Sequence, residues 1–337
     1  MKKISAIIVN WNDKQVTAEC IDSLLNQSYP ELEIIVSDNG STDGSLPFLR
    51  ERYPTVRLLD NGENLGFGRA VNRGLAVATG DLFIFLNNDL VVGESSLGEL
   101  VRLLESDSSI GAAIPKILFC EKRDTLNSFG VQVHFTGMAY PYLLEQKDRP
   151  DLETQETACG GIFMFSRELY ETIGGFDDDF FLYHEDHDLS WRIRLQGKKL
   201  MVCPQAEFFH HYKFNKGTFK FYSSEKNRLH LLAKHLEPGT MLLIAPALLL
   251  VEMAQWGHAA LNGWFVLKMK SYWDLFPLLP RILKKRRAIR RQRKVPDREI
   301  VRLFEGKLEL SGMNHPLLKN ILSPLLERYW SWIRPWI

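Results

Sequence analysis

Four groups of polar residues stand where an apolar segment of the sequence ends or a helical pattern begins. They are Asn10-Trp11-Asn12, Asp38-Asn39, Asn64-Leu65-Gly66 and Asn87-Asn88-Asp89. One such group would be explained by a turn or a helix cap, since Asn and Asp favour both. Four in register instead predict a polar ridge along one edge of a sheet, and four unrelated caps are the less favoured interpretation.

Two carboxylates of this ridge could bind a ligand. Asp89 follows an apolar segment and two asparagines, so it could hold Mg²⁺ or Mn²⁺ together with phosphate oxygens. An Asx turn explains Asp89 equally well. Asp38 could accept hydrogen bonds from a ribose or a base, or it could close a turn with the nearby glycines Gly40 and Gly44.

Two adjacent carboxylates, Glu185 and Asp186, stand at the start of a helical pattern. Like charges so close raise one pKa, whereas the helix dipole lowers both. The pair could therefore include a general base that removes a proton from a hydroxyl group. The alternative is that acids simply favour helix N-termini. His184 and His187 flank the pair, but this spacing with carboxylates in between is a weak signal for zinc.

Paired glycines and paired histidines are further candidates for the same site. Gly160 and Gly161 precede an apolar segment and would let the backbone lie against a ligand. His210 and His211 end another apolar segment, where one imidazole could complete a metal shell or contact a diphosphate. A structural histidine is the more common alternative.

The pattern of the first ninety residues predicts how these groups meet. Apolar segments alternate with helical spacing: the segments are 4–9, 33–37, 56–59 and 82–86, and the helical patterns are 16–24 and 70–78. This alternation predicts an α/β fold with a doubly wound, mostly parallel sheet of the Rossmann-like kind. In such a sheet, ligands bind beyond the carboxyl ends of the strands.

Composition narrows the class of protein. The chain has 337 residues, 45% of them apolar and 25% charged, which excludes disorder, collagen and a small disulfide scaffold. Four scattered cysteines without a CxxC pair suit a reducing cytosol. The apolar run at the start is too short for a signal peptide.

The net charge is +1, but residues 281–294 carry nine Lys/Arg and no acid, so the remainder is acidic. This is not the pattern of a nucleic-acid binder.

The C-terminal third has a different character. Residues 239–251 are apolar but contain Pro246 and end at Glu252, so we expect this segment to be too short and broken to span a membrane. Aromatic residues and then the basic segment 281–294 follow. We expect a helical extension over 236–337 that associates with a membrane surface. A helical subdomain packed on the core or on a second subunit is the alternative.

Six motifs in order resemble the family 2 glycosyltransferases, and most closely their rhamnosyltransferase-like branch. They are IIVNWN, SDNGSTDGS, NLGFGRAVNRG, GDLFIFLNND, CGGIFMFSRELYETIGGFDDDFF and YHEDHDLSWRIRLQG. The resemblance covers roughly residues 4–235 and implies a GT-A glycosyltransferase domain over 1–235. It also implies a dTDP- or UDP-sugar donor, a divalent cation (Mg²⁺ or Mn²⁺) and inversion at the anomeric carbon.

The resemblance assigns roles to individual residues. Asp186 matches the catalytic base, with Glu185 beside it. Asp89 ends the triplet that stands in place of a D-x-D motif and matches a metal ligand, as does His210, although the usual H-x-x-G-x-S is stretched here to HHYKFNKGT. The donor-binding residues that we predict are Asn10, Asp38, Asn64, Gly66, Asn72, Asn88, Gly160, Gly161 and Arg192.

We therefore expect an inverting glycosyltransferase that moves a single sugar, with rhamnose favoured, from a nucleotide-diphosphate sugar to a lipid-linked saccharide acceptor. Single transfer is expected because the Q-x-x-R-W motif of processive members is absent. The expected setting is cell-surface polysaccharide synthesis, in the cytoplasm at the inner face of the cell membrane. Two alternatives are a sugar-nucleotide pyrophosphorylase, which would need a glycine-rich loop with Arg after the first strand, and a non-catalytic nucleotide-sugar binding module.

Overall fold

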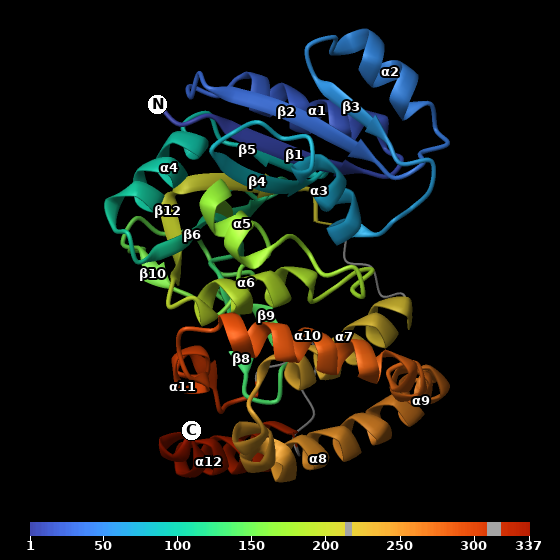
Figure 1. Ribbon diagram of the computed structural model, residues 1–337, viewed down its shortest axis with the longest axis vertical. Helices are drawn as coiled ribbons and strands as arrows, with labels where there is room; N and C mark the ends of the chain where they lie inside the picture. Colours follow the sequence, from blue (N-terminus) through green and yellow to red (C-terminus); the bar gives the residue numbers. More distant parts are fainter. Residues whose placement is uncertain (213–217, 309–317) are drawn as a thin grey trace. The chain divides into compact units, whose positions relative to one another are not determined.

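The computed structural model describes residues 1–212, 218–308 and 318–337, and one large sheet organises its N-terminal part (Figure 1). Ten strands form this sheet within the described residues: β1 (Ile4–Asn10), β2 (Leu32–Asp38), β3 (Arg57–Asp60), β4 (Leu82–Asn87), β5 (Leu90–Val92), β6 (Ile110–Phe119), β7 (Leu126–Ser128), β10 (Gln155–Glu156), β11 (Met164–Ser166) and β12 (Lys199–His210). The main path is β10-β12-β6-β11-β4-β1-β2-β3. Its half β3-β2-β1-β4 is entirely parallel. The predicted doubly wound, mostly parallel sheet is therefore confirmed.

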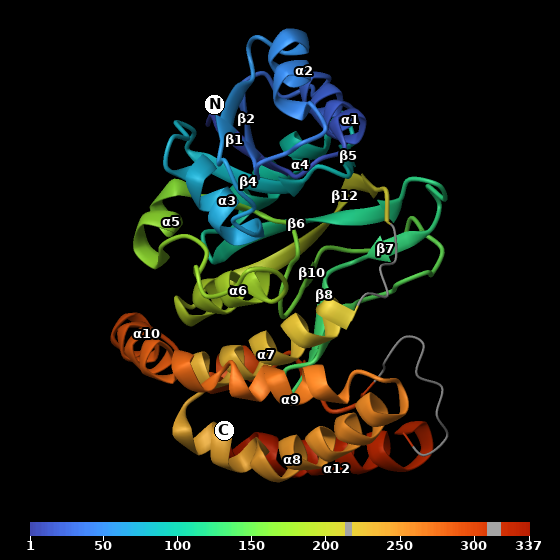
Figure 2. The same ribbon diagram turned by 90° about the vertical axis from the view of Figure 1, so that its right-hand side faces the viewer.

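Helices cover both faces of the sheet because the strands bury side chains in both directions. Along β1, Ile8 belongs to one core and its neighbours Ile7 and Val9 to the other. The first core is completed by α1 (Lys14–Leu25), α2 (Ser45–Arg52) and α4 (Ser96–Ser106). The second is completed by α3 (Phe67–Leu75), α5 (Arg167–Ile173) and α6 (Glu185–Leu195), and Figure 2 shows the two layers.

Two departures from the parallel pattern shape the carboxyl edge of the sheet. β11 is antiparallel to both of its neighbours, β4 and β6. β5 follows β4 directly and pairs in antiparallel fashion with the end of β12, which sets Leu90 opposite His210. This pairing places His210, at the end of β12, beside Asp89, the residue that precedes β5.

The chain divides into two compact units. The N-terminal unit comprises Met1–Val131, Pro141–Ile193 and Lys198–Phe214, and the helical unit comprises Gln132–Tyr140, Arg194–Gly197 and Asn215–Ile337. We predicted a domain boundary at residue 235, which is the end of α7 (Thr218–His235). By its contacts, α7 belongs to the helical unit.

The other described elements of the helical unit are mostly helices. They are α8 (Pro238–Leu261), α9 (Phe265–Trp273), η1 (Phe276–Leu278), α10 (Leu279–Gln292), α11 (Asp297–Val301), η2 (Leu318–Leu322), α12 (Ser323–Ile333) and η3 (Arg334–Trp336). A small sheet joins β13 (Phe304–Glu305), β8 (Val131–His134) and β9 (Ala139–Pro141). The predicted C-terminal helical extension is therefore present.

The apolar segment 239–251 is neither short nor broken, contrary to what its sequence led us to expect. It lies inside α8, a helix of 24 residues that continues through Pro246 and past Glu252. At about 1.5 Å per residue such a helix is roughly 36 Å long. Among the described residues, α8 is long and apolar enough to cross a membrane by length and composition, although the same is true of some core helices of soluble proteins.

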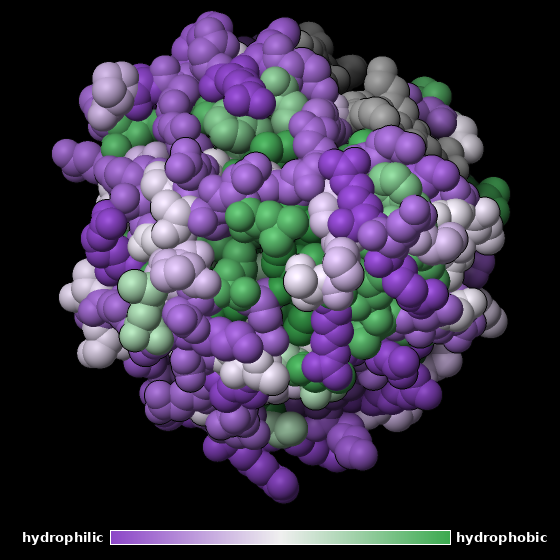
Figure 3. Space-filling view, turned by 90° about the horizontal axis from the view of Figure 1, so that it is seen from above, coloured by the Kyte–Doolittle hydropathy of each residue, from purple (hydrophilic) through white to green (hydrophobic). Residues whose placement is uncertain are grey.

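The face of the molecule drawn in Figure 3 is mostly hydrophilic, with hydrophobic residues gathered in one central area. Such a mixture is normal for a globular protein, whose polar surface does not suffice to cover it completely. This face therefore needs no special explanation.

Candidate active site

Hydrogen bonds join three of the predicted donor-binding residues at the carboxyl ends of β1, β2 and β4. The parallel register sets Asn10 opposite Asp38, and Asn10 Nδ2 donates to Asp38 Oδ2 at 2.5 Å. Asn88 Nδ2 donates to Asn10 Oδ1 at 3.2 Å. Part of the predicted polar ridge therefore exists as a connected network.

The sequence did not indicate the residues that complete this network. Ser41 donates to the two oxygens of Asp38, from its backbone N at 2.8 Å and from its hydroxyl at 2.7 Å. Thr17 Oγ1 donates to Asn10 Oδ1 at 2.6 Å. Asp38 is fully buried, so a contact with a nucleoside would require one of these bonds to be exchanged. The donor-binding role of Asp38 stays a prediction.

The two predicted metal ligands lie side by side. The pairing of β5 with β12 brings His210 Nε2 to 3.3 Å from Asp89 Oδ2. His210 Nδ1 is 3.0 Å from Asn127 Oδ1, an amide that the sequence gave no reason to single out. The backbone N of His211 donates to the carbonyl oxygen of Asp89 at 2.9 Å, but the His211 imidazole is directed away, with its Nε2 at 3.0 Å from Glu19 Oε2. Of the two histidines, His210 is the one whose imidazole lies beside the Asp89 carboxylate.

The donor set at Asp89 fits a divalent cation. Asp89 Oδ1 is buried and has no hydrogen-bond partner among the described residues, while the other carboxylate oxygen faces an imidazole nitrogen. Oxygen and imidazole donors suit Mn²⁺, and carboxylate oxygens suit Mg²⁺. Residues 213–217 of the stretched motif HHYKFNKGT lie outside the described residues.

The predicted catalytic base lies against a glycine. A Cβ at Gly161 would be 3.5 Å from Asp186 Oδ2, so the absence of a side chain there keeps the space beside this oxygen open. Asp186 Oδ1 accepts a hydrogen bond from the backbone N of His187 at 2.9 Å. Gly160 has a packing reason instead, because its Cβ would be 2.7 Å from Ile114 Cδ1.

Glu185 and Asp186 differ sharply in environment. Glu185 is buried, and its Oε2 has no hydrogen-bond partner among the described residues. Burial raises the pKa of Glu185 well above its usual range, and the charge of Asp186 raises it further. Burial thus favours the neutral form of Glu185, whereas the Asp186 carboxylate, beside Gly161, is partly exposed.

The backbone is strained just before this pair. Tyr183 and His184 have φ angles of 70° and 68°, a left-handed conformation that side chains disfavour. Such strain persists only where the surroundings impose it, and it is concentrated at functional sites. His184 Nδ1 lies 2.9 Å from Nδ1 of His187, so the ring contact bridges the turn that leads into α6.

Asn72 holds the segment that leads to α6. Its Nδ2 donates to the carbonyl oxygen of Phe176 and its Oδ1 accepts from the N–H of Phe176, each at 2.8 Å. This reciprocal pair fastens the segment to α3. The donor-binding role that we expect for Asn72 stays a prediction. In the structure, Asn72 positions the segment that contains Phe176.

Arg192, on α6, also contacts the segment that leads to α6, at residues 173–175. Its guanidinium donates to Asp188 Oδ2 at 2.9 Å, to the carbonyl oxygen of Ile173 at 2.7 Å and to that of Gly175 at 2.6 Å. The donors of this group are thus largely engaged within the chain. Its predicted contact with the donor sugar nucleotide stays a prediction.

The turn at Asn64-Leu65-Gly66 packs against the segment before α6. Gly66 has a φ of +80°, and a Cβ there would be 2.2 Å from the carbonyl oxygen of Phe181, so only glycine fits. The N–H of Phe67 donates to that same oxygen at 3.1 Å. Asn64 Oδ1 accepts from the N–H of Gly66 at 2.9 Å. Gly66, like Asn72 and Arg192, therefore positions the segment that leads to α6, the helix that carries the candidate base.

Comparison with known proteins gives a consistent result. Residues 5–174 match the protein family described as Glycosyl transferase family 2, and residues 146–215 match the N-terminal domain of galactosyltransferase. The chain is 30% identical over 210 residues to the N-acetylglucosaminyl-diphospho-decaprenol L-rhamnosyltransferase of Mycobacterium tuberculosis, covering 53% of this chain and 66% of that protein. It is 32% identical over 220 residues to the O-antigen biosynthesis protein RfbC of Myxococcus xanthus, covering 61% of this chain but 17% of that protein.

Two solved structures share the fold. GalNAc-T7, crystallised with UDP, GalNAc and Mn²⁺, matches with a TM-score of 0.58 and 18% identity, over 69% of this chain and 49% of that one. The mannosyltransferase PcManGT from Pyrobaculum calidifontis, in complex with GDP-Man and Mn²⁺, matches with a TM-score of 0.53 and 18% identity, over 87% and 86%. The predicted GT-A fold is therefore confirmed.

Proposed function

Because this chain belongs to glycosyl transferase family 2, we propose that it transfers a single sugar, with rhamnose favoured, from a nucleotide-diphosphate sugar to a lipid-linked saccharide with inversion at the anomeric carbon. The observation that carries the proposal is the Asp186 carboxylate beside Gly161 at the start of α6. Rhamnose and a lipid carrier are supported by the name of the mycobacterial relative, a decaprenol-linked L-rhamnosyltransferase. The process we propose is cell-surface polysaccharide synthesis, which the name of the O-antigen relative supports.

The proposed chemistry is one displacement at the anomeric carbon. Asp186 accepts the proton of an acceptor hydroxyl group while the acceptor oxygen forms a bond to the anomeric carbon. The bond from that carbon to the diphosphate breaks at the same time, and a nucleoside diphosphate leaves. Because the nucleophile and the leaving group occupy opposite faces of the sugar, the configuration inverts.

Asp89 and His210 would hold Mg²⁺ or Mn²⁺, whose positive charge, when bound, stabilises a leaving diphosphate. Asn127 orients the imidazole of His210 through its contact with Nδ1 at 3.0 Å. The pairing of β5 with β12 holds these two side chains beside each other, which supports the assignment.

Asp89→Ala is expected to abolish the metal-dependent part of donor binding, because it removes the carboxylate of this pair. Isothermal calorimetry with UDP- or dTDP-sugars, with and without Mn²⁺, measures the effect. Asp107→Ala, which changes an exposed acid after α4, is the matched control. Unchanged donor affinity of Asp89→Ala in Mn²⁺ would count decisively against the assignment.

A donor screen tests the proposed function itself. Release of nucleoside diphosphate is measured from dTDP-rhamnose and a set of UDP-sugars, with Mg²⁺ or Mn²⁺ and a lipid-linked N-acetylglucosamine acceptor. We expect release that depends on the acceptor and is highest with dTDP-rhamnose. Formation of pyrophosphate would support the pyrophosphorylase alternative. Donor binding without any turnover would support the binding-module alternative.

The helical unit would hold the enzyme at the cytoplasmic face of the membrane, where a lipid-linked acceptor is found. α10 buries Ile282 and Ile289 and carries most of the nine cations of residues 281–294. Each cation near an anionic lipid surface contributes about 1 kcal/mol of binding. Trp273 and Phe276 just before α10 are exposed, and aromatic rings favour the headgroup boundary.

Charge reversal on α10 is expected to reduce flotation with anionic vesicles at low salt. Lys284, Arg287 and Arg291 are exposed and suit replacement by Glu. Arg286 does not, because it donates to the carbonyl oxygen of Ala233 on α7 at 2.6 Å.

The matched control reverses exposed cations of the N-terminal unit, at Arg102, Lys147 and Arg149. If the wild-type protein does not float with anionic vesicles at low salt, the membrane proposal is wrong. If the α10 variant floats as well as the control, the basic segment plays no part.

A further inference from the structure

We propose that α8 is an in-plane membrane helix, whose outer side enters the lipid interface while its inner side stays bonded to the protein. This inference rests on the proposed membrane docking of the helical unit. It assigns the main apolar contact to a surface that we call the outer stripe. The outer stripe consists of Leu242, Pro246, Leu249, Met253, Gly257, Ala260 and Leu261.

The outer stripe runs along one side of the whole helix. Its members recur every three or four residues, which keeps them on one face, and all of them are exposed. Leu242 is 76% exposed, Leu249 64% and Leu261 88%. The stripe contains no charged residue. A continuous apolar surface of this kind marks an interaction site rather than an ordinary solvent-facing helix.

α12 extends the same kind of surface. It lies beside α8 in Figures 1 and 2, and Tyr329 Oη donates to the carbonyl oxygen of Leu243 at 2.7 Å. Trp332 on α12 is 67% exposed, and Trp336 in the following turn is 75% exposed. Tryptophan is enriched at membrane–water interfaces, because its ring is apolar and its N–H is polar. The two neighbouring helices therefore both offer groups that suit a lipid interface.

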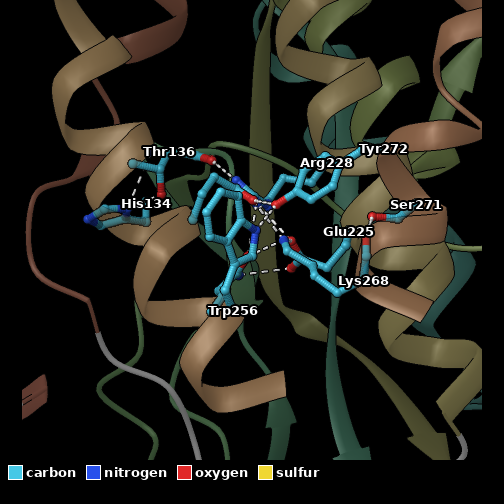
Figure 4. Close-up of polar contacts among 10 residues, drawn as sticks. His134, Thr136, Glu225, Arg228, Trp256, Lys268, Ser271 and Tyr272 are labelled. Atoms are coloured by element: carbon cyan, nitrogen blue, oxygen red, sulfur yellow. Dashed lines mark hydrogen bonds and ion pairs between the residues drawn. The ribbon is translucent and has the colours of Figure 1, made fainter. Parts of the chain in front are cut away.

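The inner side of α8 is fastened by four buried charges, which we call the charged quartet: Glu225 and Arg228 on α7, Glu252 on α8 and Lys268 on α9. Figure 4 shows Glu225, Arg228 and Lys268 pointing toward one another. Glu252 Oε2 is 2.8 Å from Lys268 Nζ, and its other oxygen pairs with Arg228. Glu225 Oε2 is 2.8 Å from Arg228. Each side chain is at most 10% exposed.

The charged quartet favours an α8 that lies in the plane of the membrane over an α8 that crosses the bilayer. Burial alone would raise the pKa of Glu252, but Arg228 and Lys268 outweigh it and lower that pKa to about 2, so the residue is charged at neutral pH. If α8 crossed the bilayer, Glu252 would leave its partners and enter lipid. Arg228 and Lys268 would remain buried with only Glu225 to balance them. The length of α8 permits spanning, but its inner side does not.

Exposed tryptophans beside the outer stripe favour lipid over a second copy of the chain as its occupant. Trp332 and Trp336 lie on and just after α12, and tryptophan suits the boundary between lipid and water. The cations of residues 281–294 lie on and after α10, which packs on α7 rather than on α8 (Figures 1 and 2), so they attract an anionic surface from a distance and do not border the stripe. The occupant we infer is an anionic lipid surface.

The test places a charge in the middle of the outer stripe of the full-length chain. Leu249→Glu combined with Met253→Glu is expected to lower partitioning onto phosphatidylcholine/phosphatidylglycerol vesicles at least tenfold. Leu25→Glu, at an exposed leucine of the N-terminal unit, is the matched control and is expected to bind like wild type. Circular dichroism shows that each variant is folded. Extraction with alkaline carbonate is expected to release the wild-type protein from membranes.

Each outcome separates this inference from the proposed function. If the wild-type protein resists carbonate extraction, α8 spans and the inference is overturned. If the stripe variant floats like wild type, the inference fails while docking through α10 stands. If the stripe variant instead converts a dimer to a monomer in sedimentation, the occupant is a second copy and the inference fails. Release of nucleoside diphosphate with a soluble acceptor analogue reports on sugar transfer independently, and the stripe variant is expected to retain it.

Discussion

Asp186→Asn is expected to lower the turnover number by about 10²-fold or more, because a general base contributes a factor of this size and an amide cannot accept the proton. The substitution keeps the shape of the side chain, so the affinity for the donor is expected to change little. An effect on turnover with little effect on binding is typical of a group that acts in the transition state. The measurement is steady-state release of nucleoside diphosphate together with calorimetric binding of the donor.

Glu168→Gln, at an acid in the first turn of α5, is the control for the loss of a negative charge in the same unit. It is expected to behave like wild type. Near-normal turnover of Asp186→Asn would show that another group accepts the proton. A loss of donor affinity equal to the loss of turnover would instead show that Asp186 serves binding.

Glu252→Ala is expected to destabilise the helical unit by about 3–5 kcal/mol, the usual cost of removing one partner from a buried ion pair. The variant leaves Arg228 and Lys268 buried with only Glu225 to balance them. Urea unfolding followed by circular dichroism measures the change. Glu99→Ala is the control, because the partner of Glu99, Arg102, is 73% exposed and such surface pairs contribute about 0–1 kcal/mol.

The pH dependence of the same variant has a defined direction. The pKa of Glu252 is about 2 in the folded protein, below the ordinary value of 4.5. The unfolded chain therefore binds this proton more tightly, so the stabilisation is complete above about pH 4.5 and is lost as the pH falls toward 2. The difference in unfolding free energy between wild type and Glu252→Ala should narrow over that range. A difference that stays constant down to pH 2 would contradict the role of the quartet.

Local patterns in the sequence were enough to predict the first half of the sheet. The segments 4–9 and 82–86 became β1 and β4, because a continuous apolar run suits a strand covered on both faces. From this followed the position of Asn10 at a strand end and of Asp89 just beyond one. What local patterns cannot give is a pairing between distant segments. The antiparallel register of β5 and β12, which sets His210 beside Asp89, is of that kind.

The same limit explains why the apolar segment of α8 was expected to be short and broken. In the sequence alone, a charged residue such as Glu252 indicates the end of an apolar segment, because its ion-pair partners are not known. Its partners Arg228 and Lys268 come from the preceding and the following helix, so a charged residue can occur inside a long helix at small cost. Likewise, nothing in the sequence shows that Arg192 holds the carbonyl groups of residues 173–175.

The insertion of β11 between β4 and β6 has a consequence for the order in which the protein can assemble. The strands β1 to β4 pair through short crossovers and can form while the rest of the chain is still being synthesised. β4 and β6 are bridged only when β11 has been made. Before β12 is made, β6 has β7 as a partner near its carboxyl end, and the rest of its length is paired only later. Until then their edges are open to pairing with other chains. The Asp89–His210 pair is thus completed late, and a nascent chain that stalls before β12 has an open, aggregation-prone sheet and lacks one side chain of the proposed metal site.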